Sequence, residues 1–462
     1  MHLTKLASLH RLDDDTSLLV NALSGAVDLV DNDLRAKLLE IGAGKRPSLQ
    51  QDHYEPLVAR GYLFGSEEEE RASLGDLYQA YQRVARARPL QLVVFPTYAC
   101  NLACTYCFED ARARARPEVM TGRQVTDLFA AIGKLLAMQP GRTGQLVLFG
   151  GEPLLPRTEA VVADLLDEAE RAELPLHVVT NGTHLERFAP LLGRHREAVR
   201  GVQITLDGPQ PVHDARRKWA NGRGSFAEVV RGVEVCFEAG LPVRLRVNLD
   251  AENIGCLEDV AELLEQRGWL GHEGFRCQLA PVTDHLGTKL DPATIGEDKL
   301  VEPVVDLWRR RPELREALRF HLFRVLHHLV SALEPGAQSR SLPRFHYCEV
   351  DRGEVLAFGP DGLIYVCPES AGVTRYAVGV YSPRYQLWPR RLERWQRRNV
   401  LTLPECQECT IATFCGGGCA YAALRQSGSS AHGACGDAPR VVAAYIAVLR
   451  ERFLRGDSTL AA

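Results

Sequence analysis

The sequence has no apolar stretch long enough to cross a lipid bilayer. Its best candidate, 441–449, has nine residues, whereas a spanning helix needs about 20. The first residues lack the basic start and the continuous apolar segment of a secretory signal, and the acidic run 13–15 interrupts that pattern. We therefore expect a cytoplasmic protein that does not bind membranes.

Excess charge, internal repeats and low-complexity segments are also missing. The net charge of −4 gives no overall basic surface, so we expect no nucleic-acid partner. With 45% hydrophobic and 25% charged residues the composition is that of a globular protein. A chain of 462 residues predicts about three domains.

Cysteine is the residue that stands out. The chain has thirteen, an odd number that cannot pair completely, and a reducing cytoplasm disfavours disulfides. Metal or cluster ligation is therefore the leading explanation. Cys236 and Cys256 lie on predicted helices and are expected to be small buried hydrophobes.

The first 86 residues predict a small domain of their own. Strand-like runs at 18–20 and 27–30 flank Ser24-Gly25, which is typical of a hairpin turn. Helical spacing follows from Leu34 to Ile41, with Asp33 as the expected N-cap. A hairpin followed by short helices predicts a winged-helix-like α+β domain over 1–86.

An acidic run, 67–70, follows that domain. It is interpreted either as a linker or as the solvated face of a helix.

From residue 87 onward, strand-like and helix-like segments alternate. The strand-like runs are 92–95, 146–149, 176–179, 202–204, 243–247 and 275–279. The clearest helix-like runs are 125–138, 160–172, 226–238 and 257–266. This alternation predicts an α/β fold with a parallel sheet and right-handed crossovers. Because a closed barrel has eight strands, we expect a partial (β/α)6 TIM-like barrel over 87–285.

The rest of the chain predicts two further parts. Residues 286–345 form a helical connector, mainly through 301–308 and 314–333. Residues 346–462 form a loop-rich, cysteine-dense domain that ends in a helix at 440–453.

Cys100, Cys104 and Cys107 follow the first predicted barrel strand. Three thiolates this close can ligate three irons of a 4Fe–4S cluster and leave the fourth iron open. If S-adenosylmethionine chelates that iron, an electron can break its carbon–sulfur bond and give a radical that abstracts hydrogen. A structural zinc site is the alternative, but no fourth ligand at zinc-like spacing lies nearby.

This CxxxCxxC spacing, with Tyr106 before the last cysteine, resembles the signature of the radical SAM superfamily. The resemblance implies an oxidoreductase that cleaves S-adenosyl-L-methionine, with Tyr106 close to the cofactor. The next strand ends in Gly150-Gly151-Glu152. In the family this segment contacts the methionyl amino group, so the resemblance carries that role to Gly150, Gly151 and Glu152.

The segment 205–209, followed by His213-Asp214 and Arg217, resembles a stretch of radical SAM enzymes that have a SPASM extension. This resemblance implies that Thr205 and Arg217 bind the cofactor carboxylate, with Asn181 and Asp207 lining the pocket. Each polar residue alone is equally typical of a turn or a loop cap, as are Arg246, Asn248 and Asn253.

The C-terminal cysteines match the SPASM pattern at every spacing; they are Cys348, Cys367, Cys406, Cys409, Cys415, Cys419 and Cys435. The resemblance implies two auxiliary 4Fe–4S clusters, and three clusters in all. Cys406, Cys409, Cys415 and Cys435 complete one, and Cys348, Cys367 and Cys419 serve the other. The resemblance does not identify the fourth ligand of this second cluster. Either one iron has no protein ligand, or His346 or Cys277 supplies it. A zinc ribbon is the alternative for 406–419 alone.

The SPASM family includes sulfatase maturases and enzymes that modify ribosomally made peptides. Pro368 stands where sulfatase maturases carry an aspartate base, which argues against that activity. The N-terminal module resembles precursor-recognition domains, which bind a leader peptide as an added strand. Its acidic residues and lack of a basic helix disfavour the other use of a winged helix, DNA binding.

We therefore expect a maturase that forms a thioether or carbon–carbon crosslink in a precursor peptide, with a reductant protein such as a flavodoxin or ferredoxin. Action on a folded protein or a small molecule is an alternative. A non-catalytic iron–sulfur regulatory protein is a more distant one.

Overall fold

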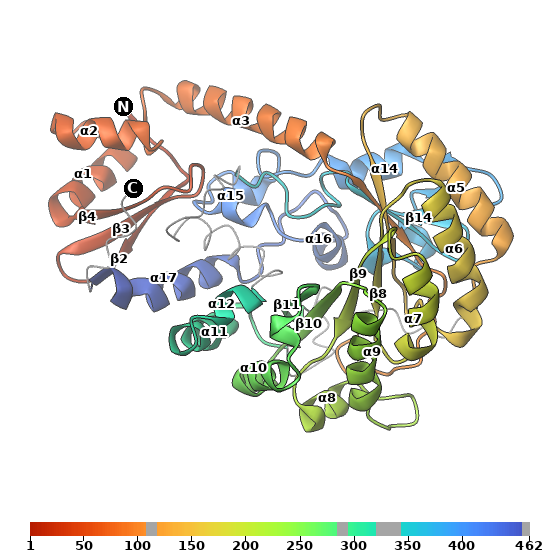
Figure 1. Cartoon of the computed structure of the whole chain (residues 1–462). Coiled ribbons are helices and arrows are strands. Elements are labelled where there is room, and N and C mark those ends of the chain that lie inside the picture. Colours follow the sequence, from red (N-terminus) through yellow and green to blue (C-terminus); the bar gives the residue numbers. More distant parts are fainter. Residues whose placement is uncertain (108–117, 284–293, 320–342, 455–462) are drawn as a thin grey trace.

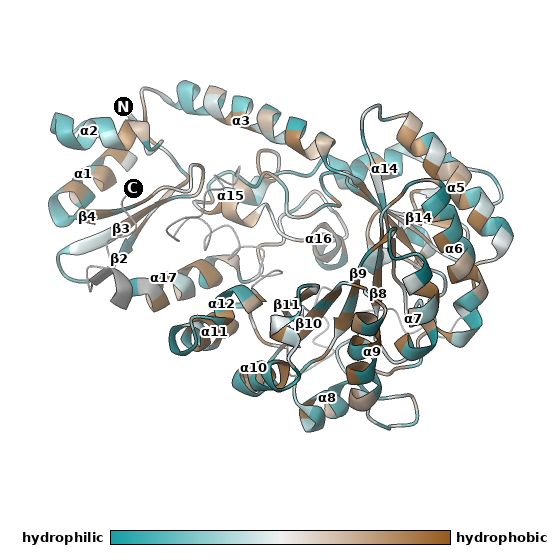
Figure 2. Cartoon of the chain, in the orientation of Figure 1, coloured by the Kyte–Doolittle hydropathy of each residue, from teal (hydrophilic) through white to brown (hydrophobic). Residues whose placement is uncertain are grey.

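The computed structural model describes residues 1–107, 118–283, 294–319 and 343–454. An N-terminal unit and an α/β barrel lie at opposite ends of the molecule, and the long helix α3 connects them (Figure 1). None of the helices within those ranges is long and apolar enough to cross a membrane. Apolar residues concentrate on the barrel strands, and the outer faces of the surrounding helices are largely hydrophilic (Figure 2).

The N-terminal unit is a three-stranded antiparallel sheet with helices on one side. Its elements are β1 (His2–Leu3), β2 (Ala7–Arg11), β3 (Thr16–Asn21), β4 (Val27–Asp31), α1 (Asn32–Gly42), α2 (Gln51–Ala59), β5 (Leu63–Phe64) and α3 (Glu67–Ala87). The sheet order is β2-β3-β4, and β1 pairs with β5. Leu19 on one face packs against Leu38 of α1, while Leu18 on the other face joins the main core. The predicted hairpin is β3–β4, and β2 is an additional strand.

Two local details of this unit differ from expectation. The N-cap of α1 is Asp31, whose carboxylate accepts a hydrogen bond from the Leu34 N–H at 2.7 Å. Asp33 lies two residues later, inside the first turn of the helix, because the chain is still extended at Asp31 where β4 ends. The acidic run 67–70 is the first turn of α3, where carboxylates interact favourably with the helix dipole. Glu70 is buried, 2.6 Å from the ring of His2.

Six parallel strands in chain order form the barrel sheet, as predicted. They are β6 (Leu90–Val94), β7 (Gly144–Leu148), β8 (Leu176–Thr180), β9 (Val199–Thr205), β10 (Val243–Leu249) and β11 (Phe275–Pro281). The covering helices are α5 (Gly122–Ala137), α6 (Glu159–Arg171), α7 (Leu185–Arg194), α8 (Gln210–Arg216), α9 (Phe226–Glu238) and α10 (Leu257–Gln266). In α5 a capping box of Thr121 and Gln124 starts the helix, and its buried side chains recur at helical spacing from Val125 to Leu135.

The sheet continues beyond the six predicted strands. β12 (Leu318–Arg319) adds parallel to β11, and β13 (Val355–Phe358) adds parallel to β6. Then β14 (Leu363–Tyr365), β15 (Gly379–Val380) and β16 (Gln386–Leu387) follow antiparallel, which gives this sheet eleven strands within the described residues. The cysteine-dense tail is therefore hydrogen-bonded to the barrel through β13.

The remaining helices are α11 (Asp298–Arg310), α12 (Leu314–Ala317), α14 (Pro389–Gln396), α15 (Ala412–Cys415), α16 (Ala420–Ser427) and α17 (Ala438–Leu454). The predicted helix 314–333 begins as expected at Leu314, but the chain passes into β12 after Ala317. Its later part, from residue 320, lies outside the described residues. α17 packs against α11 and runs beside the N-terminal sheet (Figure 1).

Candidate cluster and cofactor site

The loop with the first three cysteines follows β6 directly, at the carboxyl edge of the barrel. Its main chain is fixed by the end of α8 and the residues that follow: Ala103 donates its N–H to the Lys218 carbonyl at 2.8 Å, and Thr105 donates its N–H to the Arg216 carbonyl at 3.1 Å. The side chains of Cys100, Cys104 and Cys107 are all partly exposed. A pocket of about 380 Å³ opens beside Cys100. The loop is thus held by its neighbours while its thiols remain accessible.

Two glycines let the end of β7 lie against this loop. Gly150 has a φ of 140°, which side chains rarely adopt. A Cβ on Gly151 would lie within 3.0 Å of the carbonyl oxygens of Tyr98 and Ala99. Glu152 then donates its N–H to the same Ala99 carbonyl at 2.9 Å. This close approach brings the predicted Gly-Gly-Glu segment to the cysteines.

Glu152 ties the end of β7 to the end of β8. Its carboxylate is buried and accepts hydrogen bonds from the N–H of Leu154 (2.9 Å), the hydroxyl of Thr180 (2.6 Å) and the N–H of Asn181 (2.6 Å). Burial raises its pKa, against the effect of these donors. The Asn181 amide in turn donates to Asn101 of the cysteine loop at 2.7 Å. Glu152 and Asn181 therefore both hydrogen-bond to the cysteine loop and hold it in place.

Tyr106 is the centre of a buried polar network. Its hydroxyl donates to Asp207 and accepts hydrogen bonds from Arg217 at 2.8 Å and from the Asn248 amide at 3.1 Å. The guanidinium of Arg216 lies 4.9 Å from its ring centroid. Burial raises the pKa of Tyr106 well above its ordinary value, so the phenol stays neutral.

Arg216 is a residue of this network that the sequence did not single out. It is fully buried, bonds Asp250 at 2.5 Å and lies 3.6 Å from Asp207. Asp207 also accepts from the Asn248 N–H at 3.0 Å. These buried charges balance one another, which is the condition for keeping ionised groups in the core.

Arg217 provides the test of whether the site fits an amino-acid carboxylate. Its side chain is 6% exposed, and in the described part of the chain its Nε–H is buried with no acceptor. Burial lowers its pKa, but Cys104, Tyr106 and Asp207 together raise the pKa well above the ordinary value, so the charge is retained beside the cysteine loop. A buried cationic donor without an acceptor is costly unless a ligand supplies one. The methionyl carboxylate of S-adenosylmethionine fits this position. Thr205, the other residue that the resemblance assigned to this carboxylate, is buried at the end of β9.

The C-terminal cysteines come together in two groups. The pKa of Cys406 is raised to about 12 by burial and by the charges of Cys415, Cys409 and Cys435. The pKa of Cys367 is raised by burial and by the charges of Glu369, Cys419 and Cys348. Each thiol therefore lies within electrostatic range of the partners that the resemblance assigned to it.

Across the described residues, no three His, Cys, Asp or Glu side chains converge tightly enough to hold a single metal ion. A 4Fe–4S cluster does not require this convergence, because each thiolate binds a different iron.

Glu369 is a second residue that the sequence analysis missed. Its charge raises the pKa of Cys367 and of Cys419, and it also acts on Arg246 of the barrel. The Glu369 carboxylate is therefore within electrostatic range of this group of cysteines and of Arg246. Only its place two residues after Cys367 could have suggested this role.

The remaining predicted residues have other surroundings. The His346 ring stacks on Tyr81 with centroids 5.5 Å apart. Cys277 is buried on β11, where burial raises its pKa to about 12. Cys236 is buried in α9 as expected, whereas Cys256 is partly exposed just before α10 because its helix starts one residue later.

The fold and this site define a class of enzyme. Residues 94–264 match the model of the radical SAM superfamily. These residues form a radical SAM domain, so the chain is an enzyme that uses S-adenosylmethionine and a 4Fe–4S cluster, and not the non-catalytic regulatory protein that was the distant alternative.

The chain is also similar to individual proteins of known activity. The chain is 29% identical over 335 residues to the mycofactocin maturase MftC of Mycobacterium ulcerans, which covers 72% of this chain and 83% of the relative. It is 28% identical over 195 residues to the pre-heme d1 synthase of Dinoroseobacter shibae, covering 40% and 43%.

Among solved structures, anSMEcpe with bound AdoMet has a TM-score of 0.61 at 18% identity, covering 80% of this chain and 99% of that one. Streptococcus suis SuiB bound to the precursor peptide SuiA has a TM-score of 0.52 at 15% identity, covering 93% and 98%. At these identities the structures establish the fold.

Proposed function

We propose that this enzyme is a maturase that modifies a ribosomally synthesised precursor peptide. The observation that carries the proposal is the N-terminal sheet β2-β3-β4, at the end of the molecule opposite the barrel, whose two outer strands have no further strand paired to them among the described residues. The similarity to a maturase over 72% of the chain supports it. In this proposal 1–86 recognises the peptide, 87–285 performs the chemistry, 286–345 connects, and 346–462 holds auxiliary clusters.

Cys100, Cys104 and Cys107 would hold the cluster that binds S-adenosylmethionine. When bound there, the cluster and cofactor supply a 5′-deoxyadenosyl radical that abstracts hydrogen from the peptide. Arg217 would bind the methionyl carboxylate through its Nε–H, which is buried without an acceptor in the described part of the chain. The Gly150-Gly151 backbone and Glu152 would orient the amino group, while Tyr106 and Asp207 keep Arg217 in place.

Two auxiliary 4Fe–4S clusters complete the proposed set. Cys406, Cys409, Cys415 and Cys435 would ligate one, and Cys348, Cys367 and Cys419 the other. The mutual effects of these thiols on one another's pKa support this division. For the second cluster, Glu369 joins His346, Cys277 and an open iron as candidates for the fourth position.

The leader of the peptide would bind as an added strand at the edge of the N-terminal sheet. Main-chain hydrogen bonds supply affinity in such complexes, and pockets for alternate side chains supply specificity. Leu29 on the edge strand β4 is 55% exposed and offers an apolar contact. The core of the peptide would then reach the carboxyl edge of the barrel. We expect a thioether or carbon–carbon crosslink as the product.

The proposed reaction takes place in the cytoplasm, where thiol ligands stay reduced, with a flavodoxin- or ferredoxin-type reductant.

Co-expression with a short open reading frame beside its gene tests the function. A loss of two hydrogens per event in the peptide's mass would support crosslinking, and an unchanged mass with altered stereochemistry would indicate epimerisation. An unmodified peptide would remove that peptide as the substrate. Cys104→Ala is the matched control, and it should abolish 5′-deoxyadenosine formation.

A further inference from the structure

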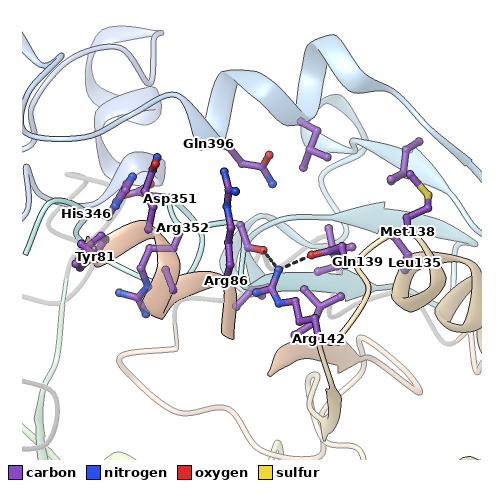
Figure 3. Close-up of a pocket in the computed structure, with 18 of the residues that line it drawn as sticks. Tyr81, Arg86, Leu135, Met138, Gln139, Arg142, His346, Asp351, Arg352 and Gln396 are labelled. Atoms are coloured by element: carbon purple, nitrogen blue, oxygen red, sulfur yellow. Dashed lines mark hydrogen bonds between the residues drawn. The ribbon is translucent and has the colours of Figure 1, made fainter. Parts of the chain in front are cut away.

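A cavity of about 380 Å³ lies between the ends of α3, α5 and α14 (Figure 3). Leu90 and Val355, at the amino ends of β6 and β13, line it, whereas Cys100 lies beyond the carboxyl end of β6. A molecule bound at this cavity would therefore leave the substrate side of the barrel open.

Three surface segments meet around the cavity, and together we name them the arginine face. They are 83–88 at the end of α3, 134–143 at the end of α5, and 384–398 across β16 and α14; each supplies residues to the cavity wall. They contain eleven Lys and Arg residues, of which Arg398 is buried near Asp351, and a single acidic residue, Glu393, in a chain whose net charge is −4. Such a concentration of one sign of charge attracts an oppositely charged partner and speeds its association.

One arginine of the cavity, Arg142, keeps part of its hydrogen-bonding capacity unused. Arg142 donates to the carbonyl of Arg88 at 3.0 Å and to the side chain of Gln139 at 2.6 Å. Its second terminal nitrogen is buried with no acceptor in the described residues. Figure 3 shows Arg86 projecting between Arg142 and Gln396. Met138, at the rim, is 70% exposed and offers an apolar contact for a partner.

The inner wall of the cavity belongs to one of the auxiliary cysteine groups. His346 and Asp351 line it, and Cys348 lies between them in the chain. The charge of Asp351 also raises the pKa of Cys419. A protein seated on the arginine face would therefore lie next to the Cys348, Cys367 and Cys419 group.

We propose that the arginine face is the docking surface of an acidic one-electron carrier protein. This inference rests on the proposed function, because it requires iron at the auxiliary cysteines. One electron passes between the carrier and that iron: the donor is oxidised by one electron, the acceptor is reduced by one, and no covalent bond forms or breaks. A carrier fits better than the precursor peptide, because the face lies at the barrel edge away from the cofactor site.

The test is direct binding of an acidic flavodoxin to the holoenzyme, measured by surface plasmon resonance at two salt concentrations. The variant carries Arg83→Glu, Arg86→Glu and Arg394→Glu; these side chains are exposed and make no side-chain hydrogen bond or ion pair in the described part of the chain. We expect its dissociation constant to rise at least tenfold at low salt and its salt dependence to shrink. The matched control carries Arg194→Glu, Arg196→Glu and Arg200→Glu, exposed around the end of α7, and should bind within twofold of wild type.

Turnover separates this inference from the proposed function. Cleavage of S-adenosylmethionine driven by dithionite should be unchanged in the variant, while cleavage driven by reduced flavodoxin should fall by the same factor as binding. Wild-type affinity in the variant, or an equal loss in the control, would overturn the docking site. So would a loss of affinity for the peptide or for a nucleic acid in place of the carrier. Failure of every peptide to react under dithionite would instead contradict the proposed function.

Discussion

Gly151→Ala is the substitution whose effect can be worked out most directly from the structure. The added Cβ would lie within 3.0 Å of the carbonyl oxygens of Tyr98 and Ala99 and of the Ala99 carbonyl carbon. All three are main-chain atoms, so no side-chain rotation can relieve the contact. Either β7 or the cysteine loop must move.

The cost can be estimated from two terms. Forcing one methyl group into a packed site costs about 1–3 kcal/mol. The shift also breaks the hydrogen bond from Glu152 N–H to the Ala99 carbonyl, now 2.9 Å, which contributes about 1 kcal/mol. We therefore expect a loss of about 2–4 kcal/mol in the free energy of unfolding, together with less iron bound per chain, because the loop carries Cys100.

Urea denaturation under anaerobic conditions measures this loss, and iron analysis measures the second effect. Gly133→Ala is the matched control: it lies inside α5 with nothing within 4 Å of the new Cβ. Alanine should stabilise that helix by about 0.5–1 kcal/mol, so the two substitutions should have opposite signs. A Gly151→Ala enzyme within about 0.5 kcal/mol of wild type and with full iron content would refute the reasoning.

Three further substitutions test other parts of the structure. Tyr106→Phe removes the hydroxyl that contacts Arg217 and Asp207. We therefore expect the free energy of unfolding to fall by about 1–3 kcal/mol and S-adenosylmethionine to bind more weakly in equilibrium dialysis. An unchanged affinity for S-adenosylmethionine would contradict this prediction. Burial, followed by the charge of Arg217, lowers the pKa of His213 to about 2, so only the unfolded chain takes up a proton as pH falls below about 6.5, and stability is lost in that direction. His213→Gln should therefore reduce the pH dependence of the free energy of unfolding by about 1.4 kcal/mol per pH unit between pH 6 and 5. Urea titrations at each pH measure this dependence, and an unaltered dependence would count against a neutral His213. Leu29→Asp on β4 should weaken leader binding in fluorescence anisotropy several-fold, whereas Leu401→Asp, also exposed, should not; equal effects would remove β4 as the docking edge.

The barrel strands could be predicted because each carries its own pattern. β6 to β11 are five to seven residues long and rich in buried Val and Leu, and the intervening helices have apolar residues at helical spacing. The strands β12 to β16 have two to four residues, which is too short for any periodicity to appear. β12 pairs with β11, and the other four strands join the barrel because β13 of the tail pairs with β6.

The cysteine groups could be predicted from the sequence because the spacing of the cysteines can be read directly along the chain. The charged network around Tyr106 was only partly accessible. Arg216 and Glu369 acquire their neighbours through the meeting of separate strand ends and loops, which no local pattern encodes. The arginine face was hidden for the same reason, because its three segments are far apart in the chain.

The pairing of β13 with β6 has a mechanical consequence. One strand leads into the Cys100 loop, and the other lies between Cys348 and Cys367 in the chain. Their register joins Val355 to Gln91 and Phe358 to Val94. Sliding the tail along the barrel would break this entire ladder, so the first set of thiols and the Cys348–Cys367 hairpin share one frame. In the proposed function, an incoming peptide would therefore meet these two groups of thiols at a fixed separation.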